Sequence, residues 1–293
     1  MLNLFFYIHK IRTTIYKPLL FLITLFYAAN LGAYSVEATL KISGSSTIQS
    51  LAEDVANLYK QRYGQPIDVQ GGGTDAGIRN TIKGISDIGM VSRALKRNEK
   101  SKLHYTTIGF DAVAIIVNVR NPLKEINRTT LITIYNGTIK NWKEITSWDQ
   151  PITIISKQTG RSTLEVFEEY TGLKHHLHGR GINGNISKDV YEAGSNIEAA
   201  TLVGGMPGAI GYVSAGTAML LIEKGMPIKI LALDGIAATR DNVINGTYPV
   251  RRELNLVYRK HDKRIINYLG LFMSIEGQEI VKAQGFIPVR KDR

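Results

Sequence analysis

The sequence predicts an α/β fold, and three observations support this prediction. Short apolar runs typical of strands alternate with stretches of helical periodicity after position 38. The loops between them are rich in glycine and hydroxyl residues, as is common where a strand leads into a helix. The run GFDAVAIIVN at 109–118 is continuously apolar, as expected of a fully buried strand. Strand, loop, helix and strand in this order are typical of a parallel sheet.

The first part of this region contains three expected strands and two expected helices. TLKIS at 39–43 indicates a short buried strand, and a helix is expected over 48–63. QPIDVQGGG at 65–73 indicates the second strand, a helix begins at Thr74, and SDIGMVSR at 86–93 indicates the third strand. In such sheets ligands lie beyond the carboxyl ends of the strands, where these loops lie.

The rest of the chain continues the alternation of strands and helices. Further expected elements are a helix at 128–135, a strand at 151–156, a helix beginning within TGRST at 159–163, a glycine-containing loop at 174–188, a strand at 208–214, a charged strand within 249–260, and two helices and a short strand within 264–290. Trp142 and Trp148 flank an expected helix end and are interpreted as packing residues.

The first 38 residues differ in character from the remainder. Lys10, Arg12 and Lys17 precede PLLFLITLFYAA at 18–29, an apolar run too short to span a bilayer as a helix. Small residues follow, and cleavage after Ser35 or Ala38 fits the preference of signal peptidases for small side chains. We predict an export signal over 1–38, with a retained membrane anchor as the alternative.

Charge and cysteine content restrict the function. The chain has 36 Lys and Arg against 25 Asp and Glu, a net charge of +11. Without Lys10, Arg12, Lys17 and Glu37 the balance is 33 against 24, which is still +9. This excess indicates an anionic partner or surface. The absence of cysteine excludes disulfides, thiolate nucleophiles and cysteine-ligated metals.

Three clusters of small residues each follow an expected strand and open an expected helix. They are SST at 45–47, GGGTDAG at 71–77 and TGRST at 159–163. One interpretation is that the hydroxyls merely cap the helices. The other is that free N–H groups and hydroxyls at the helix N-termini bind an anion. Three such clusters in one basic chain favour the second interpretation.

Two arginines lie close to these clusters in the sequence. Arg93 stands at the end of an expected strand, and Arg161 lies within the third cluster. A guanidinium fork fits a tetrahedral oxyanion because it donates two parallel hydrogen bonds. Both arginines are therefore candidate anion ligands, with a solvated surface arginine as the ordinary alternative.

Eight stretches between about residue 40 and residue 290 form a recognisable series. They are ISGSSTIQ, GGGTDAGI, DIGMVSRAL, FDAVAIIVNVRNP, IYNGTIKNW, TGRSTLEVF, PGAIGYVSAG and EGQEIVKAQGFIPV. With these motifs in the family's order, the chain resembles the exported phosphate-binding proteins of ABC-type phosphate transporters.

The resemblance implies a two-lobed periplasmic binding protein fold of type II, in which two α/β domains are joined by two hinge crossover strands. The crossovers are expected around Phe110–Asn118 and Tyr248–Val257. One lobe then comprises 39–113 and 250–293, and the other 114–249. The anion is expected in the cleft between them.

The resemblance also implies a ligand set. In the first loop it assigns Ser46 and Thr47, with the backbone N–H of Ile48, and in the second loop it assigns Thr74. In the third loop the family has an arginine followed, after three residues, by Ser-Gly-Thr. Here Lys157 occupies the arginine position, and Arg161, Ser162 and Thr163 occupy the triplet.

Two departures bear on selectivity. Lys157 cannot form the bidentate fork of an arginine, so Arg161 is expected to take that role. Some family members have an aspartate where Arg93 stands, which accepts the proton of hydrogen phosphate and repels sulfate. Others have Ser-Arg, as in Ser92 and Arg93. Asp75 or a backbone carbonyl is then the expected acceptor.

Other classes of function receive less support. The sequence has no Gly-x-Ser-x-Gly, Ser-x-x-Lys or His-Glu-x-x-His motif, and no catalytic residue is predicted. Glu165, Glu168 and Glu169 are interpreted as a solvated helix face. His175, His176 and His178 have no carboxylate motif near them in sequence, so no metal site is predicted. Dispersed basic residues argue against nucleic-acid binding.

We therefore predict a monomeric, periplasmic protein that binds inorganic phosphate without a cofactor and delivers it to an ABC permease in the inner membrane. The alternatives are a binder of sulfate, molybdate or tungstate, or a phosphate-linked hydrolase on the same scaffold.

Overall fold

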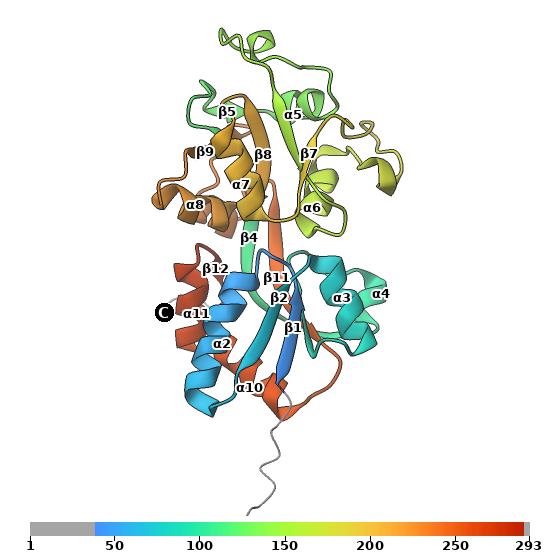
Figure 1. Cartoon of the computed structure of the whole chain (residues 1–293), viewed down its shortest axis with the longest axis vertical. Coiled ribbons are helices and arrows are strands. Elements are labelled where there is room, and N and C mark those ends of the chain that lie inside the picture. Colours follow the sequence, from blue (N-terminus) through green and yellow to red (C-terminus); the bar gives the residue numbers. More distant parts are fainter. Residues whose placement is uncertain (1–38, 290–293) are drawn as a thin grey trace, which may run out of the picture. The chain divides into compact units, whose positions relative to one another are not determined.

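The computed structural model describes residues 39–289 of the chain, and the predicted export signal at 1–38 lies outside the described residues. These residues form two lobes of mixed α/β structure, in agreement with the predicted fold class (Figure 1). We call them lobe 1 and lobe 2. Each has a central sheet with helices on its faces, and two long strands run from one lobe toward the other (Figure 1).

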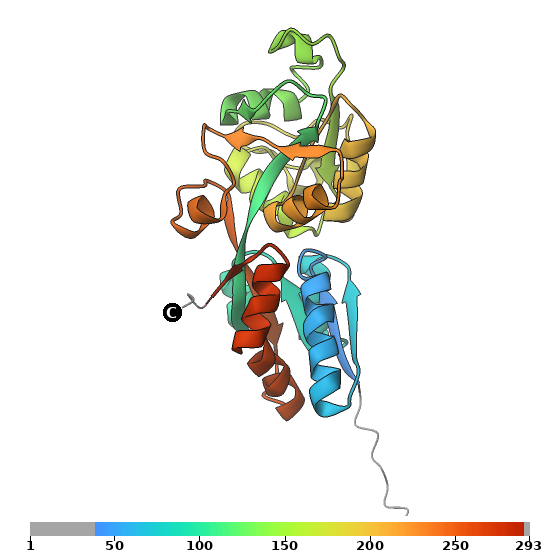
Figure 2. The same ribbon diagram turned by 90° about the vertical axis from the view of Figure 1, so that its left-hand side faces the viewer.

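Lobe 1 is built on strands β1 (Leu40–Gly44), β2 (Ile67–Gly71) and β3 (Ile88–Val91). Both β2 and β3 pair with β1 in parallel. The helices of this lobe are α2 (Gln49–Tyr63), α3 (Thr74–Lys83), α4 (Arg97–Lys100), α10 (Lys263–Phe272) and α11 (Ile275–Ala283). Helices α2, α10 and α11 pack side by side on one face of the sheet (Figure 2).

Lobe 2 repeats this arrangement with β6 (Thr153–Lys157), β7 (Tyr191–Ala193) and β8 (Ala209–Ser214). Both β7 and β8 pair with β6 in parallel. Its helices are α5 (Arg128–Tyr135), α6 (Ser162–Thr171), α7 (Asn196–Gly205), α8 (Ala215–Glu223) and α9 (Arg240–Ile244). Short elements complete the chain: β5 (Glu125–Ile126), η1 (Trp142–Glu144), η2 (His176–His178), β9 (Ile228–Ile230), β10 (Ala232–Leu233) and β12 (Ile287–Pro288).

The two long strands are β4 (His104–Asn118) and β11 (Arg251–Tyr258). Strand β11 pairs with β4 up to Ala112, and from Val113 onward β4 pairs with β8 of lobe 2. The N–H of Val113 donates to the carbonyl of Val250 at 2.9 Å. Strand β4 therefore passes from the sheet of lobe 1 to that of lobe 2 within the region where the resemblance places the crossovers. The exact lobe boundaries stay a prediction.

Each lobe has its own apolar core. In lobe 1, residues of β1, α2, α10 and α11 form one cluster, and a smaller cluster lies under α3. In lobe 2, the larger cluster includes Trp142, whose indole N–H donates to the carbonyl of Gly208 at 2.9 Å. Trp148 packs against the same cluster and is half-buried. Both tryptophans thus pack as predicted, and no helix within residues 39–289 is long and apolar enough to cross a membrane.

Trp142→Ala tests the dependence of lobe 2 on this side chain. Because the indole is fully buried, its removal leaves a cavity, and we expect the free energy of unfolding to fall by about 3–5 kcal/mol. Urea denaturation provides the measurement. Trp148→Ala, at the half-buried position, serves as the matched control and is expected to cost less. Equal losses in the two variants would contradict the packing described here.

Candidate functional site

The candidate site lies where the carboxyl ends of the parallel strands of the two lobes meet. Strands β1, β2 and β3 lead into Ser45, Gly72 and Ser92 in lobe 1. Strand β6 of lobe 2 ends at Lys157 and leads into the third cluster. Ligands of open α/β sheets bind at these ends because loops and helix N-termini converge there.

Three helices of the site begin without a side-chain cap. The residues at the N-caps of α2, α3 and α6 are Ile48, Gly73 and Arg161, and no side chain accepts a hydrogen bond from the first turn. Six other helices each have a capping side chain, namely Asn127, Ser195, Ser214, Thr239, Asp262 and Ser274. The hydroxyl clusters therefore do not serve as caps, which leaves the positive helix ends available to an anion.

Ser92 connects the three clusters. Its hydroxyl oxygen lies 2.6 Å from Ser45 Oγ and 2.6 Å from Ser162 Oγ, and its backbone N–H donates to Thr74 Oγ1 at 3.3 Å. All four residues are buried, and Ser162 belongs to lobe 2 while the others belong to lobe 1. One continuous hydroxyl network thus crosses from lobe to lobe.

Arg252 of β11 joins the network from the hinge. Its Nη1 donates to Thr163 Oγ1 at 2.9 Å, and its Nη2 donates to Thr47 Oγ1 at 3.2 Å. Its Nε and Nη2 both donate to Asp111 Oδ2 of β4, at 2.9 and 2.7 Å. Because both side chains are 1% exposed, this ion pair is shielded from solvent. The guanidinium thereby contacts one hydroxyl from each lobe.

Asn196 also links the lobes at this point. Its side-chain amide donates to Thr47 Oγ1 at 3.0 Å and accepts from the N–H of Ser214 at 3.3 Å. The sequence analysis placed Ser45 in the first cluster but not among the ligands, and it identified none of Arg252, Asp111 and Asn196. These three lie on elements that only the fold brings to the site.

Lys157 is buried at the end of β6 and is 2% exposed. Its Nζ donates to the carbonyl of Ser195 at 2.5 Å, and it forms no salt bridge among the described residues. Burial, with smaller contributions from the positive charges of Arg252 and Arg161, lowers the pKa of Lys157 from 10.5 to about 7. Glu198 opposes this shift. Lys157 is therefore a buried amine beside the hydroxyl network that lacks a contacting counter-charge.

Three further predicted residues lie around this network. Arg161 is half-buried at the start of α6, and burial lowers its pKa while Glu198 raises it. Ser46 is half-buried, and no hydrogen bond joins its side chain to the described network. The backbone N–H of Ile48 donates to the carbonyl of Ser45 at 3.1 Å.

The side chain of Arg93 contacts carboxylates and not the hydroxyls of the network. Its Nη1 and Nη2 donate to the two oxygens of Glu99 at 2.8 and 2.9 Å, and Nη2 lies 3.3 Å from Asp75 Oδ1. Its Nε lies 3.1 Å from Glu165 Oε2. Burial lowers the pKa of Arg93, but the hydrogen bonds that it donates to Glu99 and the charges of the three carboxylates raise the pKa above its ordinary value. Asp75, expected as a proton acceptor, is thus ion-paired.

One prediction about α6 is corrected. Glu168 is not on a solvated face, because it is buried and accepts from Lys174 Nζ at 3.0 Å and the N–H of His175 at 2.7 Å. In the folded chain two of the histidines contact carboxylates: His178 contacts Glu168 at 2.8 Å and His175 contacts Glu192 at 2.7 Å. The described residues contain no group of three or more such side chains that could hold a metal ion.

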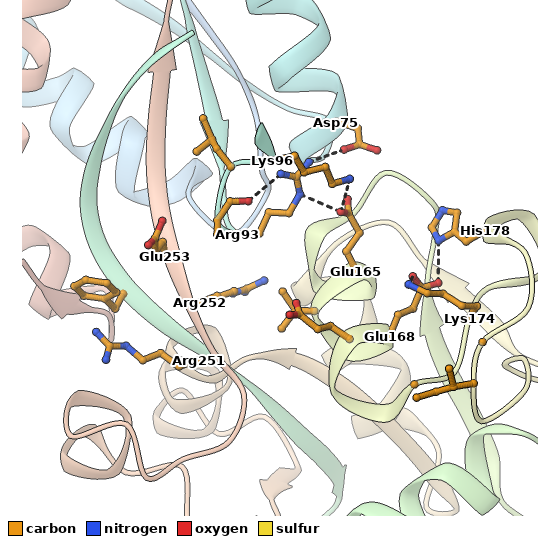
Figure 3. A pocket seen from close by; sticks show the side chains of 18 of the residues that line it. Asp75, Arg93, Lys96, Glu165, Glu168, Lys174, His178, Arg251, Arg252 and Glu253 are labelled. Carbon is orange, nitrogen blue, oxygen red and sulfur yellow. Dashed lines mark hydrogen bonds and ion pairs between the residues drawn. The ribbon is translucent and has the colours of Figure 1, made fainter. Parts of the chain in front are cut away.

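A cavity of about 1160 Å³ adjoins the site on the α6 side (Figure 3). Its lining includes Arg93 and Glu165, and the hinge residues Arg251, Arg252 and Glu253. The hydroxyls of the network do not line it. Arg93 and Arg252 therefore stand between the network and this open space.

The fold and the site define a class of binding protein. Residues 32–276 match the model of the PBP superfamily domain, and the chain belongs to that superfamily. Within it, the chain belongs to the family of phosphate-binding proteins named PstS. It is 30% identical to the phosphate-binding protein PstS of Bacillus subtilis over 270 residues, covering 88% of this chain and 83% of that protein.

Solved structures with the same fold agree with this family. A Clostridium perfringens protein, described as a phosphate ABC transporter substrate-binding protein and solved with bound phosphate, is 30% identical with a TM-score of 0.78. The similarity covers 86% of this chain and 100% of the Clostridium perfringens chain. An ABC-type phosphate transport receptor from Vibrio cholerae is 28% identical with a TM-score of 0.68, covering 85% and 99% of the two chains.

Lys157→Met tests the cost of burying this amine. The unfolded chain keeps the lysine proton up to a pH of about 10.5, whereas the folded chain releases it near pH 7. The contribution of Lys157 to the free energy of unfolding therefore rises from pH 7 to 10.5, and below pH 7 the full penalty of burying its charge is present. We expect Lys157→Met to be more stable by about a few kcal/mol at pH 6, with the difference shrinking toward pH 10.

Urea denaturation of the ligand-free protein at pH 6, 8 and 10 measures this difference. Lys60→Met, at an exposed position of α2, is the matched control and is expected to change stability by less than about 0.5 kcal/mol. A Lys157→Met protein that is less stable than the unaltered chain at pH 6 would refute the assignment of a strained, buried amine.

Proposed function

We propose that this chain captures inorganic phosphate between its two lobes and delivers it to the permease of an ABC transporter. One observation carries the proposal. Three uncapped helix N-termini, two in lobe 1 and one in lobe 2, bring their hydroxyls into a single buried network beside Lys157 and Arg252. Membership of a family whose named relatives bind phosphate supports the choice of anion.

The proposed ligands are donors from both lobes. Lobe 1 supplies Thr47 and Thr74, and lobe 2 supplies Lys157, Arg161, Ser162 and Thr163, while Arg252 donates from the hinge. In this proposal Arg93 is a structural partner of Glu99, because all three of its guanidinium nitrogens lie near carboxylates. Arg252 then replaces it as the guanidinium of the site.

The magnitudes are sufficient for tight binding without any catalytic step. A charge-assisted hydrogen bond contributes roughly 1.5–3 kcal/mol net, and micromolar affinity requires about 8 kcal/mol. Six or so donors reach this level after the cost of ordering is subtracted. Because donors from both lobes contact the anion together only in the closed form, phosphate favours closure by a shift of population.

The hinge follows from the two strands that cross between the lobes. We propose that residues 39–113 and 250–293 move as one body and residues 114–249 as the other. The change of pairing between Ala112 and Val113 supports this division. We further propose that the protein is an exported, periplasmic monomer that hands phosphate to an inner-membrane permease. In this proposal it neither turns over phosphate esters nor binds nucleic acid.

Selectivity for phosphate over sulfate requires an acceptor for the phosphate proton. Hydroxyl oxygens accept as well as donate, so the serines and threonines of the network supply such acceptors. Sulfate carries no proton at neutral pH, so a hydroxyl whose own proton is donated within the network is left as an acceptor without a partner.

Calorimetric titration of the residue 39–293 protein with phosphate, sulfate, molybdate and tungstate tests the proposal. We expect heat with phosphate and at least tenfold weaker binding of the others. Thr74→Ala and Ser162→Ala each remove a buried hydroxyl, and each is expected to weaken phosphate binding about tenfold. Thr201→Ala, an exposed hydroxyl on α7, is the matched control and is expected to bind normally.

The outcomes separate the candidate functions. Binding of sulfate, molybdate or tungstate without phosphate would assign another oxyanion. Turnover of a chromogenic phosphate ester that is lost in Ser162→Ala would assign a hydrolase. Unaltered phosphate affinity in both Thr74→Ala and Ser162→Ala would remove the hydroxyl network from the site.

Proton uptake gives an independent test of Lys157. A bound anion favours the charged amine and so raises the pKa of Lys157 from its value of about 7 in the free protein. At pH 8, we therefore expect phosphate binding to take up protons, and Lys157→Met to take up fewer. Titrations in buffers of different ionisation enthalpy measure this number. Equal uptake by the two proteins would exclude Lys157 from the site.

A further inference from the structure

An ion-pair cluster outside the hydroxyl network also connects the lobes. Glu165 of α6, in lobe 2, lies 3.1 Å from Arg93 Nε and 2.9 Å from Lys96 Nζ, both in lobe 1. Figure 3 shows the Glu165 carboxylate extending from α6 toward the two basic side chains. The contact lies at the edge of the large cavity, beside the site and separate from its proposed ligands.

The lobe 1 half of this cluster is held in place by its own contacts. Glu99 of α4 accepts from two guanidinium nitrogens of Arg93, and its Oε2 also accepts from the N–H of Lys96 at 2.8 Å. Asp75 of α3 contacts Arg93 Nη2 from a second side. The Arg93 guanidinium therefore needs little further ordering when Glu165 approaches, which reduces the entropic cost of forming the contact.

Burial distinguishes the two contacts of Glu165. The side chain of Arg93 is 7% exposed and that of Glu165 is 19% exposed, whereas that of Lys96 is 55% exposed. An exposed ion pair contributes little because water and salt screen it. The Arg93–Glu165 contact is a largely shielded ion pair, and Arg93 Nε, which forms no hydrogen bond among the described residues, has this carboxylate 3.1 Å away. Separation of the lobes would leave this buried N–H without its carboxylate.

We propose that Glu165 and Arg93, assisted by Lys96, form an ionic clasp that holds lobe 2 on lobe 1 and thereby sets the affinity for the anion. Glu165 acts as a positioning residue: it contacts the other lobe, and the proposed ligands do not include it. The predicted effect of the clasp on phosphate affinity rests on the proposed function. Its predicted effect on closure of the lobes rests on the geometry alone.

The sign of the effect of Glu165→Gln separates the clasp from simple electrostatics. Glu165 is an anionic group near a site for an anion, so its charge alone repels phosphate, and its neutralisation would tighten binding. A clasp present only in the closed form has the opposite effect, because its loss disfavours closure. We expect Glu165→Gln to bind phosphate about tenfold more weakly, and Lys96→Met to bind it about twofold more weakly.

Glu169→Gln is the matched control. Glu169 lies four residues further along α6, is exposed, lines the same cavity, and forms no salt bridge among the described residues. The substitution makes the same change of charge and is expected to leave phosphate affinity within twofold of the unaltered chain. Tighter or unchanged binding by Glu165→Gln, or an equal loss in Glu169→Gln, would overturn the clasp.

A distance measurement tests the clasp without any ligand. Because the chain has no cysteine, cysteines at the exposed positions Asn98 and Ile182 place one spin label in each lobe. In phosphate-free buffer we expect Glu165→Gln to shift the distance distribution to longer values, and Glu169→Gln to leave it unchanged. Identical distributions in all three proteins would refute the clasp, whereas absence of phosphate binding by the unaltered chain would refute only the proposed function.

Discussion

The buried ion pair between Asp111 and Arg252 is the contact on which the arrangement of the site depends. A guanidinium that is 1% exposed is costly unless a carboxylate accepts its hydrogen bonds, and Asp111 does so from the neighbouring strand. Since β4 and β11 are the strands that run from lobe to lobe, the pair lies at the hinge. Arg252 also donates to Thr47 of lobe 1 and to Thr163 of lobe 2. The same side chain therefore contacts both lobes at the hinge.

The absence of caps on α2, α3 and α6 has a stability cost that the rest of the fold tolerates. An N-cap contributes about 1 kcal/mol, and six helices within residues 39–289 have one. Helices α2, α3 and α6 are those whose first turns adjoin the network of Ser92. Glycine assists there: a Cβ on Gly73, at φ +95°, would lie 2.7 Å from the carbonyl oxygen of Gly160 in the other lobe. The lobes thus approach each other closely at the same place where the helix N-termini lack caps.

Much of the fold was predictable because its signals are local. The strand–loop–helix alternation predicted β1, β2 and β3 with the helices between them, and the apolar run at 109–118 predicted most of β4. Helices α7 and α8 were not predicted, because they are largely apolar and lack the periodicity of an amphipathic helix. Their place between β7, β8 and β9 explains this composition.

The site was predictable only in its loops. Thr47, Thr74, Ser162 and Thr163 belong to clusters that the sequence displays directly, and the structure brings them into one network. Arg252 lies 141 residues from Asp111 along the chain, and Asn196 lies 149 residues from Thr47, so no local pattern reveals either contact. Likewise, Arg93 looks like a free guanidinium in the sequence, because its carboxylates come from α3, α4 and α6.

The charge balance of the site explains why an anion completes it. Arg252 has Asp111, and Arg93 has Glu99 with two further carboxylates, so these guanidinium groups are already compensated. Lys157 and Arg161 form no salt bridge among the described residues, and burial lowers the pKa of both. Two such basic groups beside helix N-termini that lack capping side chains favour a counter-charge at this place. In the proposed function a small oxyanion supplies that charge and accepts N–H and O–H donors at the same time, so that ligand binding also relieves the buried charge.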